Sequence, residues 1–416
     1  MDAMKTFVFL LAAGLAFSAE PDGLILPPGF HASIVSESLG PIRHLAVRPN
    51  GDLYISTAVD RQNKGDGIIA VHLDANHKAD RVEHFGAVTG GTGIRFYKGA
   101  LYAASATAVY RFMFDGNNEL LPGKDPEVIV DGMPAEHPGF ARANVALAFD
   151  DKGSLYVALE ASDNLCIDKT APQGAPATGL KPCPDLARRA GVWRFNANKI
   201  GQKFPTDGEQ LATGIRDISS LDWSAADGHL YGLMHGRDNT NRMFPTLVSA
   251  EDDNNIADEM HLITKGSNFG WPYTYYDGAR KLRLIAPEYG GDGKTTAPAG
   301  AYSTPVATFQ GPRAAPVDLL FYAGNKFPAE YRGGAFIVLH GTRNKNGYDV
   351  VFVPFSRQGK SGEPRVFADG FAGFAANGAA PGRAQYRPIG EAVGADGALY
   401  IGDSQKGRVW RISYGD

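Results

Sequence analysis

The chain has 416 residues, with 41 Lys and Arg against 45 Asp and Glu and a net charge of −4. This near balance, without a basic run, argues against a nucleic-acid-binding protein. The 51 Gly and 26 Pro favour a fold with many turns, and long helical periodicity is absent after residue 20.

The first 19 residues have the layout of a secretory signal peptide. Lys5 supplies a positive charge, residues 6–17 are apolar, and small residues at 16–19 precede Glu20. The apolar stretch is short for a bilayer span, so an uncleaved anchor is the weaker alternative. We therefore expect residues 20–416 to be periplasmic or secreted, with no membrane span after cleavage.

A hairpin pattern recurs six times after this segment. In each copy a short apolar strand runs into a turn rich in Asn, Asp and Gly, and a second strand follows that opens on apolar and aromatic residues. The copies occupy residues 45–57, 91–105, 145–159, 220–234, 319–340 and 392–404.

Six such hairpins indicate the fold. A single hairpin cannot bury its own apolar face, but six arranged around an axis can. The repeats therefore predict an all-β, six-bladed β-propeller that occupies residues 20–416 as one domain. In such a fold the loops at the mouth of the central channel are the place to look for a binding site.

The two cysteines, Cys166 and Cys183, bracket a loop rich in Pro, Gly and Ala. In an oxidising compartment they most simply form one disulfide, and the alternative is two free buried thiols. No CxxCH element is present, so we expect no covalently attached c-type haem.

Five stretches of the chain read, in order, HGRD (235–238), KGSNFGWPYTYYD (265–277), APEYGGDG (286–293), FPAEYRGGAF (327–336) and YRPIG (386–390). Together they resemble the soluble pyrroloquinoline-quinone (PQQ)-dependent sugar dehydrogenases, and most closely their sorbosone-dehydrogenase-like branch. They occur in the order of that family, and the similarity runs from about Gly29 to Ile412.

The resemblance implies a fold, two cofactors and a reaction. Members of the family are six-bladed propellers that hold PQQ over the channel mouth with a calcium ion. They transfer a hydride from a sugar hydroxyl to the quinone with the help of a base. The implied calcium ligands in this chain are the backbone carbonyls of Gly236 and Arg237, because calcium prefers oxygen donors.

The resemblance also implies residues that bind the quinone, between blades four, five and six. His235 would lie beside it, and Arg216 would contact cofactor or substrate. Lys345 and Arg387 are the expected partners of its carboxylates. The alternatives are a histidine packed at a strand end, a surface ion pair for Arg216, and solvated loop cations. Trp271, Tyr273, Tyr275 and Tyr276 would form either a sugar-stacking wall or blade core.

Two departures from the family fall on the cofactor site. Asp217 replaces an asparagine, and a carboxylate there would repel an anionic cofactor unless it were protonated or turned away. Arg343 replaces a tryptophan and would compensate for that charge. Glu160 stands near the mouth where the family has glycine.

A third departure concerns the base. The family's catalytic histidine corresponds in register to Arg142, which would bind cofactor or substrate but could not accept a proton. The nearest histidine is His137, in the same loop. We predict His137 as the general base, with an ordinary loop histidine as the alternative.

Three functions compete on these grounds. The first is an exported dehydrogenase that oxidises a small-molecule sugar or polyol with PQQ and Ca²⁺ and passes electrons to a separate cytochrome or quinone acceptor. The second is a calcium-dependent propeller lactonase, which would need a ring of side-chain carboxylates around the metal. The third is a quinone- or glycan-binding propeller without the redox step, since fold resemblance predicts reaction poorly.

Overall fold

The structure is a computed structural model that describes residues 18–20, 23–57, 67–86, 91–134, 144–170, 177–309, 314–341, 347–373 and 384–415. None of the helices in these ranges combines the length and the hydropathy needed to cross a bilayer. Of the expected signal peptide, only Ser18 and Ala19 are described. They form strand β1 (Ser18–Ala19), which pairs with β2 (Ile25–Leu26).

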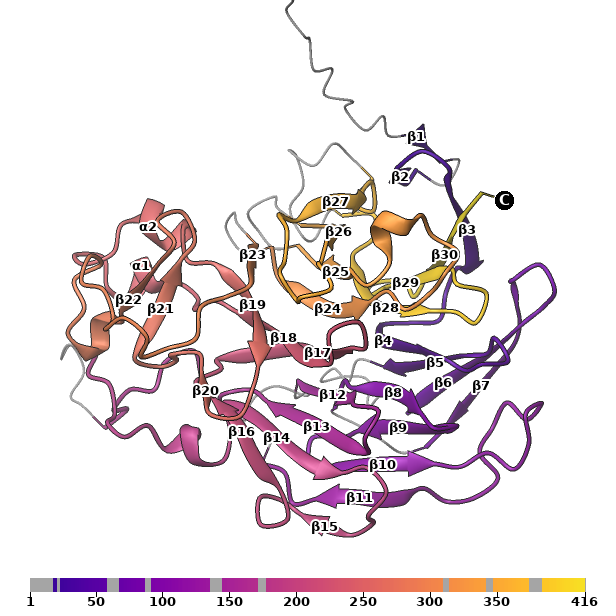
Figure 1. Cartoon of the computed structure of the whole chain (residues 1–416), viewed down its shortest axis with the longest axis horizontal. Helices are drawn as coiled ribbons and strands as arrows, with labels where there is room; N and C mark the ends of the chain where they lie inside the picture. The colour runs from indigo at the N-terminus through magenta and orange to yellow at the C-terminus, as the bar shows by residue number, and fades with distance from the viewer. Residues whose placement is uncertain are drawn as a thin grey trace, which may run out of the picture.

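Six sheets arranged in a ring confirm the predicted six-bladed propeller (Figure 1). The two innermost strands of each blade correspond to one of the six sequence repeats. They are β4 (Ile42–Val47) and β5 (Leu53–Thr57), β8 (Ile94–Tyr97) and β9 (Ala100–Ala104), β12 (Val145–Phe149) and β13 (Ser154–Leu159), β17 (Asp217–Ser224) and β18 (His229–His235), β24 (Pro316–Phe321) and β25 (Ala335–Leu339), and β28 (Pro388–Val393) and β29 (Leu399–Asp403). Each innermost strand contacts the innermost strands of both neighbouring blades.

The outer strands complete the blades in the same order. Blade 1 adds β6 (Ile68–Leu73) and β7 (Ala79–Phe85), and blade 2 adds β10 (Ala108–Phe112), β11 (Glu127–Asp131) and β15 (Gln202–Lys203). Blade 3 adds β14 (Gly191–Asn196), β16 (Glu209–Thr213) and β20 (Ser267–Asn268), and blade 4 adds β19 (Asp258–Ile263) and β23 (Ala307–Phe309). Blade 5 adds β26 (Asp349–Val353) and β27 (Arg365–Ala368), and blade 6 adds β30 (Val409–Tyr414) and β3 (Phe30–Ser36). Strands β15 and β20 come from later in the chain and pair in parallel with the blade that they extend.

The inner hairpins have the turns that the repeats predicted. All six turns contain a glycine with positive φ, such as Gly51 at 101° and Gly153 at 100°. Side chains rarely adopt this conformation, so a glycine at the turn lets the two strands pair in register. Blades pack face to face, so β5 and β9 are buried on both sides, which explains their apolar runs LYIS and ALYAA.

The ring is closed by the two ends of the described chain. Strand β3 pairs antiparallel with β30, so the first strand of the ring completes the last blade. Phe30 in β3 is 1% exposed and makes edge contacts with Phe327, Tyr331 and Phe367. Closure removes the exposed sheet edge that an open ring would leave.

A small side module extends from blade 4, at the left of the ring in Figure 1. It consists of α1 (Thr240–Met243), α2 (Ala250–Asn254), β21 (Thr274–Asp277), β22 (Leu282–Ile285) and the 3₁₀ turn η2 (Pro287–Tyr289). Two further 3₁₀ turns, η1 (Pro184–Ala187) and η3 (Ala329–Tyr331), lie elsewhere. The module leaves the ring directly after the segment HGRD, so it stands beside the channel mouth.

Candidate functional site

The mouth of the central channel is built from residues that flank the innermost hairpins. In blade 3, Asn144 precedes β12 and donates from its backbone N and its Nδ2 to the two carboxylate oxygens of Glu160, at 3.2 and 3.0 Å. In blade 4, Asp217 opens β17 and lies opposite His235, the last residue of β18. The two blades are joined because Asn144 Nδ2 also donates to Asp217 Oδ1, at 2.9 Å.

Three arginines surround this mouth. Arg43 is the second residue of β4, while Arg216 and Arg387 immediately precede β17 and β28. Arg43 also donates to the Asn144 side chain, at 3.4 Å, which places blade 1 in contact with blade 3. Three guanidinium groups around one opening favour a ligand that carries several carboxylates.

Asp217 and His235 form an ion pair at the mouth. His235 Nδ1 lies 3.1 Å from Asp217 Oδ2, and its Nε2 lies 2.8 Å from the carbonyl oxygen of Pro316. Both ring nitrogens therefore face acceptors, which requires a proton on each and a positively charged imidazole.

The pKa values follow from this geometry. Burial lowers the pKa of His235, but the charge and hydrogen bond of Asp217, the charge of Asp258 and the hydrogen bond to Pro316 together outweigh it and raise the pKa to about 9. Burial would likewise raise the pKa of Asp217, but the charges of His235 and Arg216 hold it well below its usual range. The pair is thus doubly charged and neutral overall at pH 7, so the repulsion expected from Asp217 is cancelled by its neighbour.

The segment 236–238 is held from several sides. Arg216 donates to the carbonyl oxygen of Gly236, at 2.8 Å, and to Asp238 Oδ2, at 2.6 Å. The backbone N of Gly236 donates to Asp258 Oδ1, at 2.9 Å. A Cβ at position 236 would lie 2.5 Å from the carbonyl oxygen of Ala257, so the backbone can pass here only as glycine.

This segment fits the expected calcium ligands. No group of three or more His, Cys, Asp or Glu side chains within the described ranges is placed to hold a metal ion. Among the described residues, the backbone oxygens of Gly236 and Arg237 are the expected donors to a calcium ion at the mouth. The Gly236 carbonyl oxygen already accepts from Arg216, so a calcium ion would use its second lone pair or displace the guanidinium.

Blades 5 and 6 meet at a second polar cluster. Arg387 NH2 donates to His340 Nδ1, at 3.0 Å, and to the carbonyl oxygen of Gly341, at 2.6 Å. His340 Nε2 lies 2.8 Å from the hydroxyl of Ser404. Because Arg387 donates to Nδ1, the proton of His340 is on Nε2 and this imidazole is neutral. The guanidinium of Arg387 is thus held in place by His340 and Gly341 and is not a solvated loop cation.

Four residues predicted at the site lie outside the described residues. They are His137, Arg142, Arg343 and Lys345. Their predicted roles stay predictions. The structure brings together Arg216, Asp217, His235, Gly236 and Arg237, and it places Arg387 on the His340 cluster.

The disulfide and the aromatic residues lie beside the site. Cys166 and Cys183 are bonded, as predicted. Trp271 is 5% exposed, packs against the disulfide and donates from Nε1 to the carbonyl oxygen of Asn164. Tyr275 and Tyr276 are also buried, which fits the core alternative rather than a sugar-stacking wall.

Sequence reasoning missed Arg43, Asn144 and His340, and it noted Glu160 only as a departure. The signal that could have found them is their position next to the innermost strands. The β12–β13 register pairs Val145 with Leu159, so the preceding and following residues must face each other. Arg43 and His340 flank hairpins in the same way.

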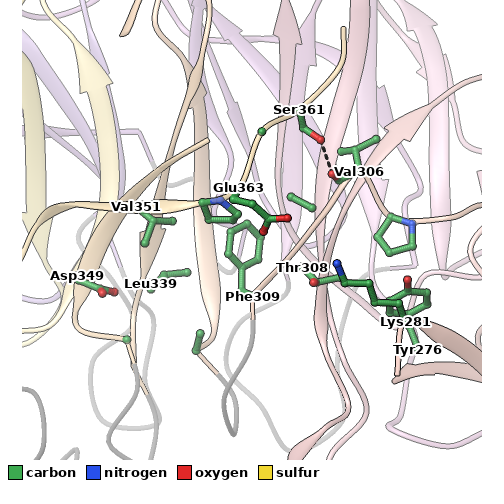
Figure 2. Close-up of a pocket in the computed structure, with 16 residues that line it drawn as sticks. Tyr276, Lys281, Val306, Thr308, Phe309, Leu339, Asp349, Val351, Ser361 and Glu363 are labelled. Atoms are coloured by element: carbon green, nitrogen blue, oxygen red, sulfur yellow. Dashed lines mark hydrogen bonds between the residues drawn. The ribbon is translucent and has the colours of Figure 1, made fainter. Parts of the chain in front are cut away.

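A separate cavity of about 800 Å³ lies at the outer edge of the ring, between blades 4 and 5. Figure 2 shows Asp349 and Glu363 on its blade 5 side and Lys281 on the opposite wall. Burial and the charge of Asp369 raise the pKa of Asp349 to about 7. Tyr276 of the predicted aromatic set lines this cavity, whereas none of the described residues predicted to bind the cofactor or the metal does.

The fold and the mouth together define a class: a six-bladed propeller whose channel mouth carries arginines, carboxylates and backbone carbonyl groups. Residues 24–415 match the model of the TrAA12-like family. The chain belongs to this family, which confirms the resemblance without specifying the sorbosone branch.

Solved structures share the fold of this chain. The PQQ domain of a pyranose dehydrogenase from Coprinopsis cinerea, in its holo form, superposes with a TM-score of 0.74 at 18% identity, over 95% of this chain and 98% of that chain. A Trichoderma reesei carbohydrate-active enzyme of family AA12 gives 0.71 at 14% identity, over 97% and 99%. A soluble aldose sugar dehydrogenase from Escherichia coli gives 0.60 at 17% identity, over 92% and 99%.

One curated relative is similar in sequence. It is an uncharacterized protein from Borreliella burgdorferi, 25% identical over 213 residues. The match spans about half of this chain and about half of the relative.

Proposed function

We propose that this protein is an exported oxidoreductase that oxidises a sugar or polyol with bound PQQ and Ca²⁺. The observation that carries the proposal is the set of three arginines, Arg43, Arg216 and Arg387, which lie at the starts of innermost strands at the end of the channel that carries segment 236–237. Support comes from the family match and from neighbours named as a holo pyranose dehydrogenase PQQ domain and an aldose sugar dehydrogenase.

The residues at the mouth have distinct roles in this proposal. Arg216 and Arg387, with Lys345 and Arg343 from the loop after β25, bind the carboxylates of the quinone. His235, paired with Asp217, presents a fixed positive charge beside the cofactor and neutralises the carboxylate. The carbonyl oxygens of Gly236 and Arg237 bind Ca²⁺.

When bound, PQQ would accept the hydride that leaves the substrate carbon, and Ca²⁺ would polarise its carbonyl as a Lewis acid. The protein must then accept the proton of the substrate hydroxyl. His235 is already protonated at neutral pH because Asp217 holds its proton, so it cannot be the base. We assign that role to His137, with Arg142 binding substrate or cofactor.

Export and electron transfer complete the proposal. Residues 1–19 act as the signal peptide, and residues 20–416 function in the periplasm or outside the cell. The electrons leave to a separate acceptor, a cytochrome or a quinone.

A second candidate is a PQQ- or glycan-binding propeller without the redox step. It is favoured by the state of the two mouth histidines that the structure describes. His235 is protonated in its ion pair, and His340 accepts from Arg387. No observation among the described residues of the mouth favours the lactonase alternative.

One experiment separates the two. The mature protein is incubated with Ca²⁺ and PQQ, PQQ binding is measured by fluorescence titration, and dye reduction is assayed with aldoses, sorbosone and polyols. Turnover supports the dehydrogenase, PQQ binding without turnover supports the second candidate, and absence of PQQ binding refutes the dehydrogenase.

Two variants test the residues. Arg387→Leu should weaken PQQ binding at least tenfold, whereas Arg194→Leu, which removes a half-exposed arginine on blade 3, should not. His137→Ala should abolish turnover and retain PQQ binding. Full activity in this variant would remove His137 from the mechanism.

A further inference from the structure

A buried ion pair lies directly behind the segment proposed to bind calcium. Arg237 NH2 donates to both carboxylate oxygens of Glu288, at 2.8 and 2.9 Å. The two side chains are only 3% and 0% exposed. The Arg237 guanidinium also lies 5.8 Å from the ring centroid of Tyr275 in β21. The side chain of Arg237 is therefore held by the side module.

Glu288 is itself fixed by a third element. It lies in η2, and its carbonyl oxygen accepts from the backbone N of Gly179, at 2.8 Å, in the loop closed by the disulfide. The next residue, Tyr289, donates its hydroxyl to the carbonyl oxygens of Cys166 and Leu180 at 3.0 and 3.1 Å. The ion pair thus connects segment 236–238 through η2 to the disulfide loop.

The role of such a pair is better explained by the placement of the segments that it joins than by a gain in the stability of the fold. Taking two charges out of water has a desolvation cost that their attraction often only balances, so buried ion pairs add little net stability. They do fix the relative placement of the segments that carry them. Groups that hold metal ligands in orientation also typically change metal affinity 10- to 100-fold when they are removed.

We propose that the Arg237–Glu288 pair positions the carbonyl oxygens of residues 236 and 237 for calcium, and that it couples metal binding to the order of the side module. Arg237 has two functions in this proposal. Its backbone oxygen faces the metal, while its side chain, held by Glu288, fixes the peptide that carries that oxygen. By thermodynamic reciprocity, calcium binding at the mouth must then stabilise η2. The inference rests on the proposed function.

The test uses calcium alone and the mature protein, without PQQ. Glu288→Gln keeps the size of the side chain and removes the charge, so calcium affinity measured by isothermal titration calorimetry should fall at least tenfold. Glu127→Gln is the matched control, because it removes the partner of Arg111 in a more exposed pair on blade 2, and it should bind calcium like the wild type. Hydrogen exchange should show that calcium protects the backbone amides of residues 288 and 289 in the wild type and not in Glu288→Gln.

A second variant separates positioning from folding. Arg237→Met combined with Glu288→Leu keeps the site packed and leaves no buried charge. It should unfold near the wild-type temperature without calcium, yet still bind calcium at least tenfold more weakly. Wild-type calcium affinity in either variant, or calcium protection of the amides of residues 288 and 289 in Glu288→Gln, would overturn the inference alone. Failure of the wild type to bind calcium would overturn both the inference and the calcium part of the proposed function.

Discussion

The Asp217–His235 pair predicts a specific dependence of stability on pH. The pKa of His235 is about 9 in the folded protein against an ordinary value of 6.5. A histidine whose pKa is raised on folding stabilises the protein fully below the unfolded pKa, and this contribution is lost as the pH rises through the folded pKa. At about 1.4 kcal/mol per pKa unit, the contribution is at most about 3 kcal/mol below pH 6.5.

The perturbation is Asp217→Asn, which restores the amide found in the family and removes the partner charge. The variant should be less stable than the wild type by up to about 3 kcal/mol at pH 6, and the difference should shrink as the pH rises from about 6.5 and be nearly gone above pH 9. Urea unfolding at several pH values between 5.5 and 10 measures this. The control is Asp80→Asn, which breaks an ion pair with His72 that is 47% and 44% exposed and should change stability by less than about 1 kcal/mol.

Two results would refute the reasoning. The first is an equal loss of stability at pH 6 and pH 10 in Asp217→Asn. The second is a wild-type His235 that titrates near pH 6.5 when its ring protons are followed by NMR, where the ten histidines can be assigned by single substitutions.

Further predictions concern stability. Reduction of Cys166–Cys183, which are 17 residues apart, should lower the free energy of unfolding by about 3 kcal/mol in urea titrations with and without reductant; no change would contradict the loop-closure argument. Phe30→Ala should cost about 3–5 kcal/mol in the same assay, because it opens a cavity where β3 closes the ring. Burial and the nearby charge of Asp318 raise the pKa of Glu391 well above its ordinary value, and its carboxylate oxygens have no hydrogen-bond partner. The free energy of unfolding that this group contributes is therefore lost as the pH rises above 4.5. The variant Glu391→Gln should show a smaller decrease of the free energy of unfolding between pH 5 and 9 than the wild type. The same decrease in both proteins would show that Glu391 ionises freely.

The fold could be predicted from the sequence because its signal is local. A hairpin turn with a positive-φ glycine is encoded within about 13 residues, and six copies specify six blades. The parallel additions β15 and β20 could not be predicted, because each pairs with a strand distant in the sequence and has only two residues.

The site was predictable only in part, for a related reason. The sequence predicts that the carboxylate of Asp217 repels the anionic cofactor and that the positive charge of Arg343 compensates for it. The β17–β18 hairpin places Asp217 directly opposite His235, but a register shift between Ile218 and Ser220 intervenes, so counting through the turn would have paired Asp217 with Gly236 instead. The contact between Asn144 and Asp217 crosses two blades and depends on the packing of the ring, which no local pattern encodes.

The pairing of β3 with β30 also constrains the order in which the molecule can be made. Blade 6 takes three strands from the last 29 residues and one from residues 30–36, so it cannot be completed until the ribosome has delivered nearly the whole chain. Blades 1 to 5 can assemble earlier as an open arc with an exposed edge. Ring closure therefore waits for the synthesis of β30, and until that pairing forms the arc keeps an unpaired strand edge.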